Sequence, residues 1–364
     1  MKLSLGKELL SNEGWLRKAA QLRARFDSVH RLFHTKKYSH PDDLFFSFEN
    51  LPIMGKEYWF LHFSVPGTKM QSVLTFGRAE GDVTVNRTPV KKHAGSYSLP
   101  GNAIKCAAVC WQYGRKKQVV IDSHANVVLD CSDEKSRLCA ASGPKNKVCV
   151  EGKYPNYRVL LRKAGKAIFT AKVFSPKKGK PFEIINILRS PIARGFGAVM
   201  VNYYFEFDGV MEGKRVNGKA YLQKVVAVLP LAPWNWVRVQ FANGAAGDFF
   251  MGKPLGNSGS EIHFACNDYL ELNGERIRPE GHLSLESWFD GENRKWLLSG
   301  KNFYLAMETY ALQPFVMRQK TVFRYDEYLV CVTDFRMKAG GKTYSLSDLG
   351  AASGIVEDAS GYLI

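Results

Sequence analysis

The chain has 364 residues, of which 45% are hydrophobic and 23% charged, as in soluble globular proteins. Its length predicts two domains, and no apolar run reaches the roughly 18 residues that a membrane-spanning helix needs. The N-terminus MKLSLGKELLSNEGW lacks an apolar core followed by a small-residue cleavage site, so we expect a cytoplasmic protein. The net charge of +17 predicts attraction to polyanions, anionic membrane surfaces and negatively charged ligands.

The first 42 residues are predicted to be helical. Between residues 5 and 35, apolar side chains recur at spacings of three and four, with arginines and lysines between them. This pattern is typical of a basic amphipathic helix. Such a helix either docks its apolar side onto the rest of the protein or lies on a membrane surface.

From Asp43 onward the sequence predicts β-strands. Short segments rich in Val, Ile, Phe, Tyr and Trp alternate with Gly, Pro, Asn and Lys, which favours an antiparallel all-β protein. Two segments run alike, since Trp59 is followed by Gly67 and Trp236 by Gly244, each eight positions on. We therefore predict two related β-barrels packed together, over 43–212 and 213–364, with the break among the turn signals of 205–217.

Sequence motifs for cofactors and metals are missing. The seven cysteines contain no CxxC pair, and Cys106 and Cys110 are interpreted as buried thiols in a reducing compartment rather than as ligands. No P-loop, GxGxxG after a strand, GxSxG or HExxH occurs. No cofactor and no metal ion are predicted.

The positive charge is concentrated in turn-like clusters near residues 91, 116, 145 and 178. Lysines in turns are commonly solvated charges that keep strand edges from pairing. Nucleic acid is a disfavoured partner, because no RNP-type aromatic signature or zinc knuckle accompanies the charge. An anionic membrane surface stays open as a partner, and the oligomeric state is not set by the sequence.

Several short aromatic and glycine-containing motifs occur along the chain: Glu57-Tyr58-Trp59-Phe60, Phe76-Gly77-Arg78, Asn202-Tyr203-Tyr204-Phe205, Gly209 to Gly213, Gly218 to Lys224, Pro233 to Gln240, and a glycine-rich C-terminal segment with Gly350, Gly354, Glu357 and Gly361. With these motifs the chain resembles the superfamily that contains carotenoid 1,2-hydratases, tocopherol cyclases and lipocalin-like Diels-Alderases, a group of two-domain calycin-like proteins.

The resemblance implies two lipocalin-like barrels with an aromatic-lined cavity for a long apolar molecule. It also implies protonation or folding of that molecule in a dry pocket. The chain departs from the pattern at Gln223 and Val225, where hydratase-like relatives carry Asp and Glu. Gln cannot protonate an alkene, so hydratase chemistry is not expected from position 223.

Candidate site residues follow from these motifs. Glu57, His62, Glu308 and Glu357 are available for acid–base work, and Glu57 is favoured because a carboxyl beside Tyr58 and Trp59 in a barrel wall would lose hydration. The predicted catalytic residues are Glu57, Tyr221 and Gln223, with Tyr221 and Gln223 on one strand face. The predicted ligand-binding residues are Trp59, His62, Tyr203, Tyr204, Trp234 and Trp236, although core filling explains the aromatic side chains equally well.

Three functions remain open at this stage. The first is binding of a hydrophobic, isoprenoid or lipid-like small molecule without turnover. The second is an enzyme, an isoprenoid hydratase (a lyase), cyclase or isomerase that protonates its substrate with a carboxylic acid. The third is binding of polyanions or a membrane surface through the basic face, motivated by the net charge.

Overall fold

The computed structural model of the chain describes residues 16, 17, 20, 51, 54–90, 103–114, 118–123, 126–132, 135–142, 145–175, 182–187, 197–228, 230–253, 262–263 and 268–363. The helix predicted over 5–35 lies outside these residues, apart from Leu16, Arg17 and Ala20, which are helical and exposed. The lysine clusters near 91, 116 and 178 also lie outside them. Within the described part of the chain, none of the helices combines the length and apolar character needed to cross a bilayer.

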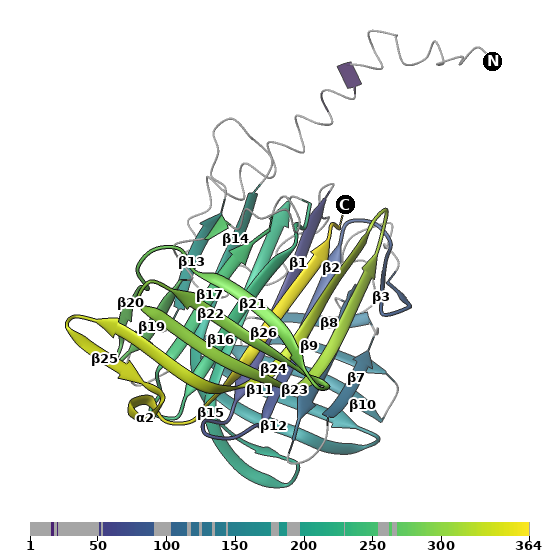
Figure 1. Cartoon of the computed structure of the whole chain (residues 1–364). Coiled ribbons are helices and arrows are strands. Elements are labelled where there is room, and N and C mark those ends of the chain that lie inside the picture. The colour runs from purple at the N-terminus through teal and green to yellow at the C-terminus, as the bar shows by residue number, and fades with distance from the viewer. Residues whose placement is uncertain are drawn as a thin grey trace.

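The predicted all-β class is confirmed (Figure 1). The strands form two antiparallel sheets. Beyond the N-terminal segment, the described residues form one short helix, α2 (Leu346–Leu349). The first sheet contains β1(Gly55–Ser64), β2(Gln71–Ala79), β5(Ala103–Lys105), β6(Ala107–Tyr113), β7(Gln118–Ser123), β8(Asn126–Ser132), β9(Lys135–Ser142), β10(Asn146–Lys153), β11(Asn156–Lys163), β12(Lys166–Phe174), β13(Phe182–Ile187), β14(Gly197–Met211) and β15(Lys214–Val228). The second contains β3(Val83–Val85), β4(Thr88–Val90), β16(Trp234–Phe241), β17(Ala246–Gly252), β18(Ile262–His263), β19(Tyr269–Leu272), β20(Glu275–Ile277), β21(Ser284–Asp290), β22(Asn293–Gly300), β23(Phe303–Arg318), β24(Val322–Ala339), β25(Lys342–Ser345) and β26(Ala352–Gly361).

The first sheet curls into a nearly closed barrel. Its strands follow the order β5-β8-β9-β10-β11-β12-β14-β15-β1-β2-β6-β7, with β13 beside β14. The last strand, β7, comes back near β9 and β10, and the Lys163 ammonium donates a hydrogen bond to the Val120 carbonyl across that closure. The barrel interior is filled by apolar side chains that include Trp59, Leu61 and Phe63.

The second sheet curls around a core of its own. Its order is β20-β19-β17-β16-β26-β24-β23-β22-β21, and one apolar cluster joins Leu270 of β19 with Trp296 of β22 from opposite parts of this sheet. The β3–β4 hairpin comes from the first half of the chain but pairs with β23 through Val85 and Met317. This crossover ties the two halves together.

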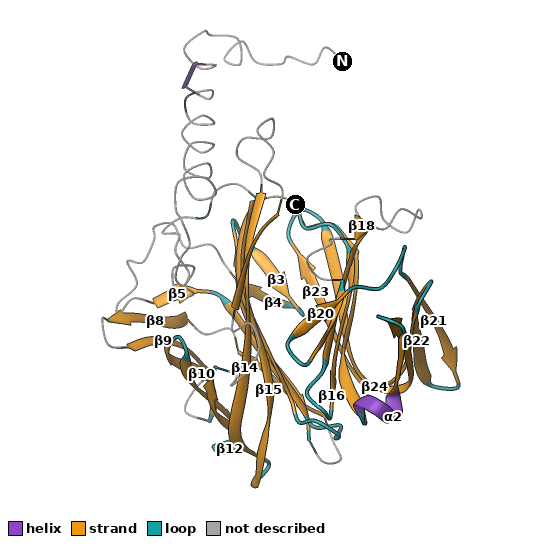
Figure 2. Ribbon diagram, turned by 90° about the vertical axis from the view of Figure 1, so that its left-hand side faces the viewer, coloured by secondary structure: helices purple, strands orange, loops and turns teal. Residues whose placement is uncertain are grey.

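The two sheets pack face to face, and the strands at the contact are buried on both sides (Figure 2). In β1, Trp59 and Leu61 face the first barrel, while the alternate residue Phe60 faces the second sheet. In β16, Val237 faces the second core and Trp236 faces the first sheet. Successive side chains of a strand point to opposite faces, so these strands place apolar side chains on both faces.

The chain passes from the first sheet to the second between Val228 and Trp234. The predicted boundary at 212/213 falls instead on the turn between β14 and β15, which pair along their whole length from Met211↔Lys214 to Gly197↔Val228. The crowded turn signals of 205–217 therefore mark one long hairpin. We propose that the second unit begins after Val228.

The cysteines divide into two kinds. Cys106 and Cys110 are buried, as the sequence predicts. Cys139 and Cys149 are opposed on neighbouring strands and form a disulfide that the sequence did not predict. Their pairing depends on the β9–β10 register, which sequence spacing does not specify.

Candidate functional site

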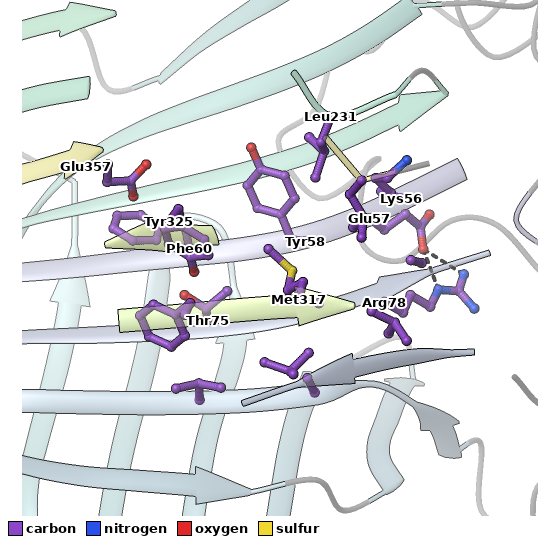
Figure 3. A pocket seen from close by; sticks show the side chains of 18 of the residues that line it. Lys56, Glu57, Tyr58, Phe60, Thr75, Arg78, Leu231, Met317, Tyr325 and Glu357 are labelled. Atoms are coloured by element: carbon purple, nitrogen blue, oxygen red, sulfur yellow. Dashed lines mark hydrogen bonds and ion pairs between the residues drawn. The ribbon is translucent and has the colours of Figure 1, made fainter. Parts of the chain in front are cut away.

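A cavity of about 140 Å³ lies between the two sheets (Figure 3). Its walls come from β1, β2, β6 and β15 of the first sheet and from β3, β16, β17, β23, β24 and β26 of the second. The apolar residues of the wall include Phe60, Val83, Val85, Val109, Trp234, Trp236, Phe250, Phe315, Met317 and Leu363. The polar residues are Lys56, Glu57, Tyr58, Thr75, Arg78, Gln223, Tyr325 and Glu357.

Aromatic rings from both sheets meet at the cavity. Phe60 of β1 contacts Trp236 of β16 edge-on, with ring centroids 5.5 Å apart. Phe315 and Tyr325 stack at 4.8 Å, and Trp234 lies 5.2 Å from Phe323. These contacts hold the rings in fixed orientations, so the wall presents preformed π-faces to whatever enters.

Glu357 on β26 is the acidic group at one end of the cavity (Figure 3). Its side chain is buried, and its Oε2 accepts a hydrogen bond of 2.7 Å from the Trp234 indole. Burial raises the pKa of the Glu357 carboxyl to about 7, against the opposing effect of the indole, and the negative charge of Asp248 raises it further. A carboxyl with this pKa is partly protonated at neutral pH and can both donate and accept a proton.

Glu57 and Arg78 occupy the other end (Figure 3). They face each other on β1 and β2, and Arg78 donates to Glu57 Oε2 from Nη2 at 2.6 Å and from Nε at 2.8 Å. Glu57 is 2% exposed and is thus the partner that neutralises a largely buried guanidinium. Because Glu57 accepts both of these bonds, we propose a structural role for it in place of the general-acid role expected from the sequence.

Lys56 adds a second cation at this end. Its Nζ donates to the Met54 carbonyl at 3.0 Å, and burial lowers the pKa of the Lys56 ammonium to about 8. Tyr58, which lies between the Glu57 and Glu357 ends in Figure 3, has its pKa raised by burial and by the charge of Glu357. One end of the cavity is therefore an apolar pocket with an acid, and the other carries charged groups.

Tyr221 and Gln223 lie on the same face of β15, as the alternation of strand residues predicts. Tyr221 donates to Asn202 Oδ1 at 2.8 Å, and Gln223 donates to the Tyr221 oxygen at 3.0 Å. Gln223 reaches the cavity wall, whereas the ring of Tyr221 packs on Trp236 behind it. The Tyr221 hydroxyl thus positions the Gln223 amide.

A buried polar network that the sequence did not predict borders this region. Asp248 on β17 accepts hydrogen bonds from the Trp236 indole at 2.8 Å and from Arg238 Nη1 at 2.6 Å. The Arg238 guanidinium lies over the Tyr221 ring at 4.1 Å. The hydroxyls of Tyr204 and Tyr269 share a further hydrogen bond of 2.8 Å. This network fixes the Trp236 ring that lines the cavity.

The other predicted ligand-binding residues lie away from the cavity. Trp59 and Tyr203 are inside the first barrel, where the Lys224 ammonium sits 4.1 Å from the Trp59 ring centre. His62 faces the second sheet and bonds Gln71 through Nε2 at 2.5 Å. Burial lowers the pKa of His62 to about 4, so it is neutral near pH 7. Among the described residues, no cluster of His, Cys, Asp and Glu has the makeup of a metal site.

Comparison with known proteins returns distant solved structures. No protein-family model matches the chain. No curated protein matches it either. Among solved structures, a putative AttH from Nitrosomonas europaea is 12% identical with a TM-score of 0.48, covering 85% of this chain and 93% of its own. The structure called CghA is 10% identical with a TM-score of 0.47, covering 84% and 88%.

A third structure, kievitone hydratase from Nectria haematococca, is 11% identical with a TM-score of 0.37 and covers 90% of this chain and 96% of its own. At this level of identity we take no activity from these structures, and the function proposed below depends on the side chains of the cavity.

Proposed function

We propose that the protein is an enzyme that protonates an apolar small molecule in the cavity between the sheets, with Glu357 as the general acid. Hydration, cyclisation and isomerisation of an isoprenoid-like substrate all begin with this step. The observation that carries the proposal is a buried carboxyl at the wall of an apolar cavity, with its pKa raised to about 7. A general acid works best when its pKa lies near the operating pH, and such residues contribute about 10²- to 10⁴-fold in rate.

The surroundings of Glu357 suit a cationic intermediate. Protonation of a carbon–carbon double bond leaves a carbocation on the substrate and a carboxylate on the enzyme. The Trp234 indole donates its hydrogen bond to that carboxylate, and Trp234, Trp236 and Phe60 line the same cavity. An aromatic face attracts a cation by about 0.5–2 kcal/mol, more when water is excluded.

The size of the cavity limits the substrate. About 140 Å³ is smaller than the roughly 300–1,000 Å³ of typical ligand pockets. The cavity therefore holds a small substrate or the reacting end of a longer one. Lys56 and Arg78 at the far end favour a substrate whose polar group lies away from the double bond that Glu357 protonates.

Binding of an apolar ligand without turnover is the second candidate, favoured by the mainly apolar wall of the same cavity. Quenching of tryptophan fluorescence measures binding in either case, because Trp234 and Trp236 line the cavity. If the protein is a carrier, the wild type and Glu357→Gln should bind the ligand equally well, and neither should form a product. Binding of polyanions or membranes through the basic face stays a prediction, tested by whether binding is lost as salt is raised.

The test of the enzymatic proposal is a screen of short isoprenoid alkenes, with products identified by mass spectrometry. Glu357→Gln should lose about 10²-fold or more in kcat while the ligand affinity stays within a few fold. Glu308→Gln is the matched control, because Glu308 is a partly buried strand glutamate outside the cavity that bonds Asn293 at 3.0 Å. Full turnover by Glu357→Gln would exclude Glu357 as the acid.

A further inference from the structure

A second glutamate stands directly beside Glu357. Glu327 on β24 is the cross-strand partner of Glu357 on β26, and both side chains point toward the first sheet. Opposed residues of an antiparallel pair have Cβ atoms about 4.5–5.5 Å apart, so the two carboxyl groups are neighbours. Glu327 is 0% exposed and lies behind Glu357, outside the cavity wall.

Each carboxyl of this pair accepts a hydrogen bond from an indole. Trp111 of the first sheet donates to Glu327 Oε2, and Trp234 of the second sheet donates to Glu357 Oε2. An indole N–H can only donate, so both Oε2 atoms are held as acceptors. The Tyr325 side chain also hydrogen-bonds the Glu327 carboxyl. Glu327 Oε1 has no hydrogen-bond partner among the described residues, so we assign the proton to this oxygen.

Two neighbouring buried carboxyls cannot both be ionised at neutral pH, because each charge disfavours the other. Burial and the negative charge of Glu357 raise the pKa of Glu327 well above its usual range. The charge of Glu357 is one cause of the raised pKa of Glu327, which makes Glu357 the member of the pair that loses its proton first. Glu327 then remains a neutral carboxylic acid next to the Glu357 carboxylate.

We propose that Glu327 is a positioning residue that holds a second proton behind Glu357 and stabilises the Glu357 carboxylate by donating an O–H hydrogen bond to it. The inference rests on the proposed function for its catalytic meaning. In the step itself, the π electrons of the substrate double bond form a C–H bond with the Glu357 proton. The carboxylate left behind accepts hydrogen bonds from Glu327 Oε1 and Trp234 Nε1. When the substrate cation adds water, the resulting protonated alcohol gives an O–H proton back to Glu357. When the cation instead loses a proton from a neighbouring carbon, that proton returns to Glu357. Nothing is oxidised or reduced in either case.

Infrared spectroscopy tests the neutral state of Glu327 without any substrate. At pH 8, the C=O band of a protonated buried carboxyl should be present in the wild-type protein, in Glu357→Gln and in Glu308→Gln, and lost in Glu327→Gln. Absence of the band from the wild type at pH 8, or its persistence in Glu327→Gln, would overturn the inference. Because no turnover is involved, this result is independent of whether Glu357 acts as a catalyst.

Kinetics of two Glu327 variants test the positioning role. Glu327→Gln keeps a donor and should keep the pH midpoint of kcat, whereas Glu327→Leu removes the donor. We expect Glu327→Leu to lower kcat about 10-fold or more at unchanged KM and to move the midpoint to higher pH. A midpoint that stays in place in Glu327→Leu would show that Glu327 only fills space, and would overturn the role. Should Glu327→Leu fail to fold, the infrared band still decides whether Glu327 holds the second proton.

Discussion

Replacing Glu357 by Gln should change how the stability of the protein depends on pH. Burial raises the pKa of Glu357 from 4.5 to about 7 in the folded protein. Below pH 4.5 the carboxyl is protonated in both folded and unfolded chains and costs nothing. Between these two pKa values the folded state binds more protons, so stability falls as pH rises. Above pH 7 the full penalty of about 3 kcal/mol is present.

Urea unfolding of the wild-type protein and of Glu357→Gln at pH 4.5 and pH 8 measures this penalty. The difference in free energy of unfolding between the two proteins should move by about 3 kcal/mol in favour of Glu357→Gln on going to pH 8. The comparison uses the difference between the two proteins because other groups, His62 among them, also titrate in this pH range and change the stability of both. Glu308→Gln should show no such movement. A difference that is the same at both pH values would refute the raised pKa of Glu357.

The remaining predictions concern the groups around the cavity. Glu57→Gln should cost about 3–5 kcal/mol in urea unfolding because it leaves Arg78 buried without its carboxylate, and adding Arg78→Met should recover most of that loss. The pKa of His62 is lowered from 6.5 to about 4, so stability should fall by about 3 kcal/mol as pH drops through this window, and His62→Gln should abolish that part of the loss. Trp234→Phe removes the hydrogen bond that lowers the pKa of Glu357, and the midpoint of the kcat–pH profile should then move above pH 7; an unmoved midpoint would contradict this.

The fold class could be predicted because strand spacing and turn residues are local signals. The likeness between the Trp59 and Trp236 segments also has a physical basis, since both strands lie at the contact between the sheets. The alternation of side chains along a strand does not tell which face of the strand points into its own barrel and which points toward the other sheet. Both faces of β1 are buried, so the sequence cannot tell that Tyr58 meets the cavity while Trp59 enters the first barrel.

The pairing of charges could not be predicted because it depends on strand register. Glu57 loses its hydration as expected, but it meets Arg78 through the β1–β2 pairing, and that ion pair is the basis of the structural role that we propose for it. Glu357 was among the candidates from the sequence, but its partner Glu327 comes from a strand paired across a long connection. Two acidic residues inside apolar strands are the signal that could have drawn attention to this pair.

Transfer of deuterium to a bound alkene in D₂O tests the central claim most directly, because it detects protonation even when no product is released. We predict that the wild-type protein incorporates deuterium at carbon, that the rate falls as pH rises through about 7, and that Glu357→Gln reduces it about 10²-fold or more. Incorporation that is unaffected by Glu357→Gln, or a bound alkene that never acquires deuterium, would contradict the account.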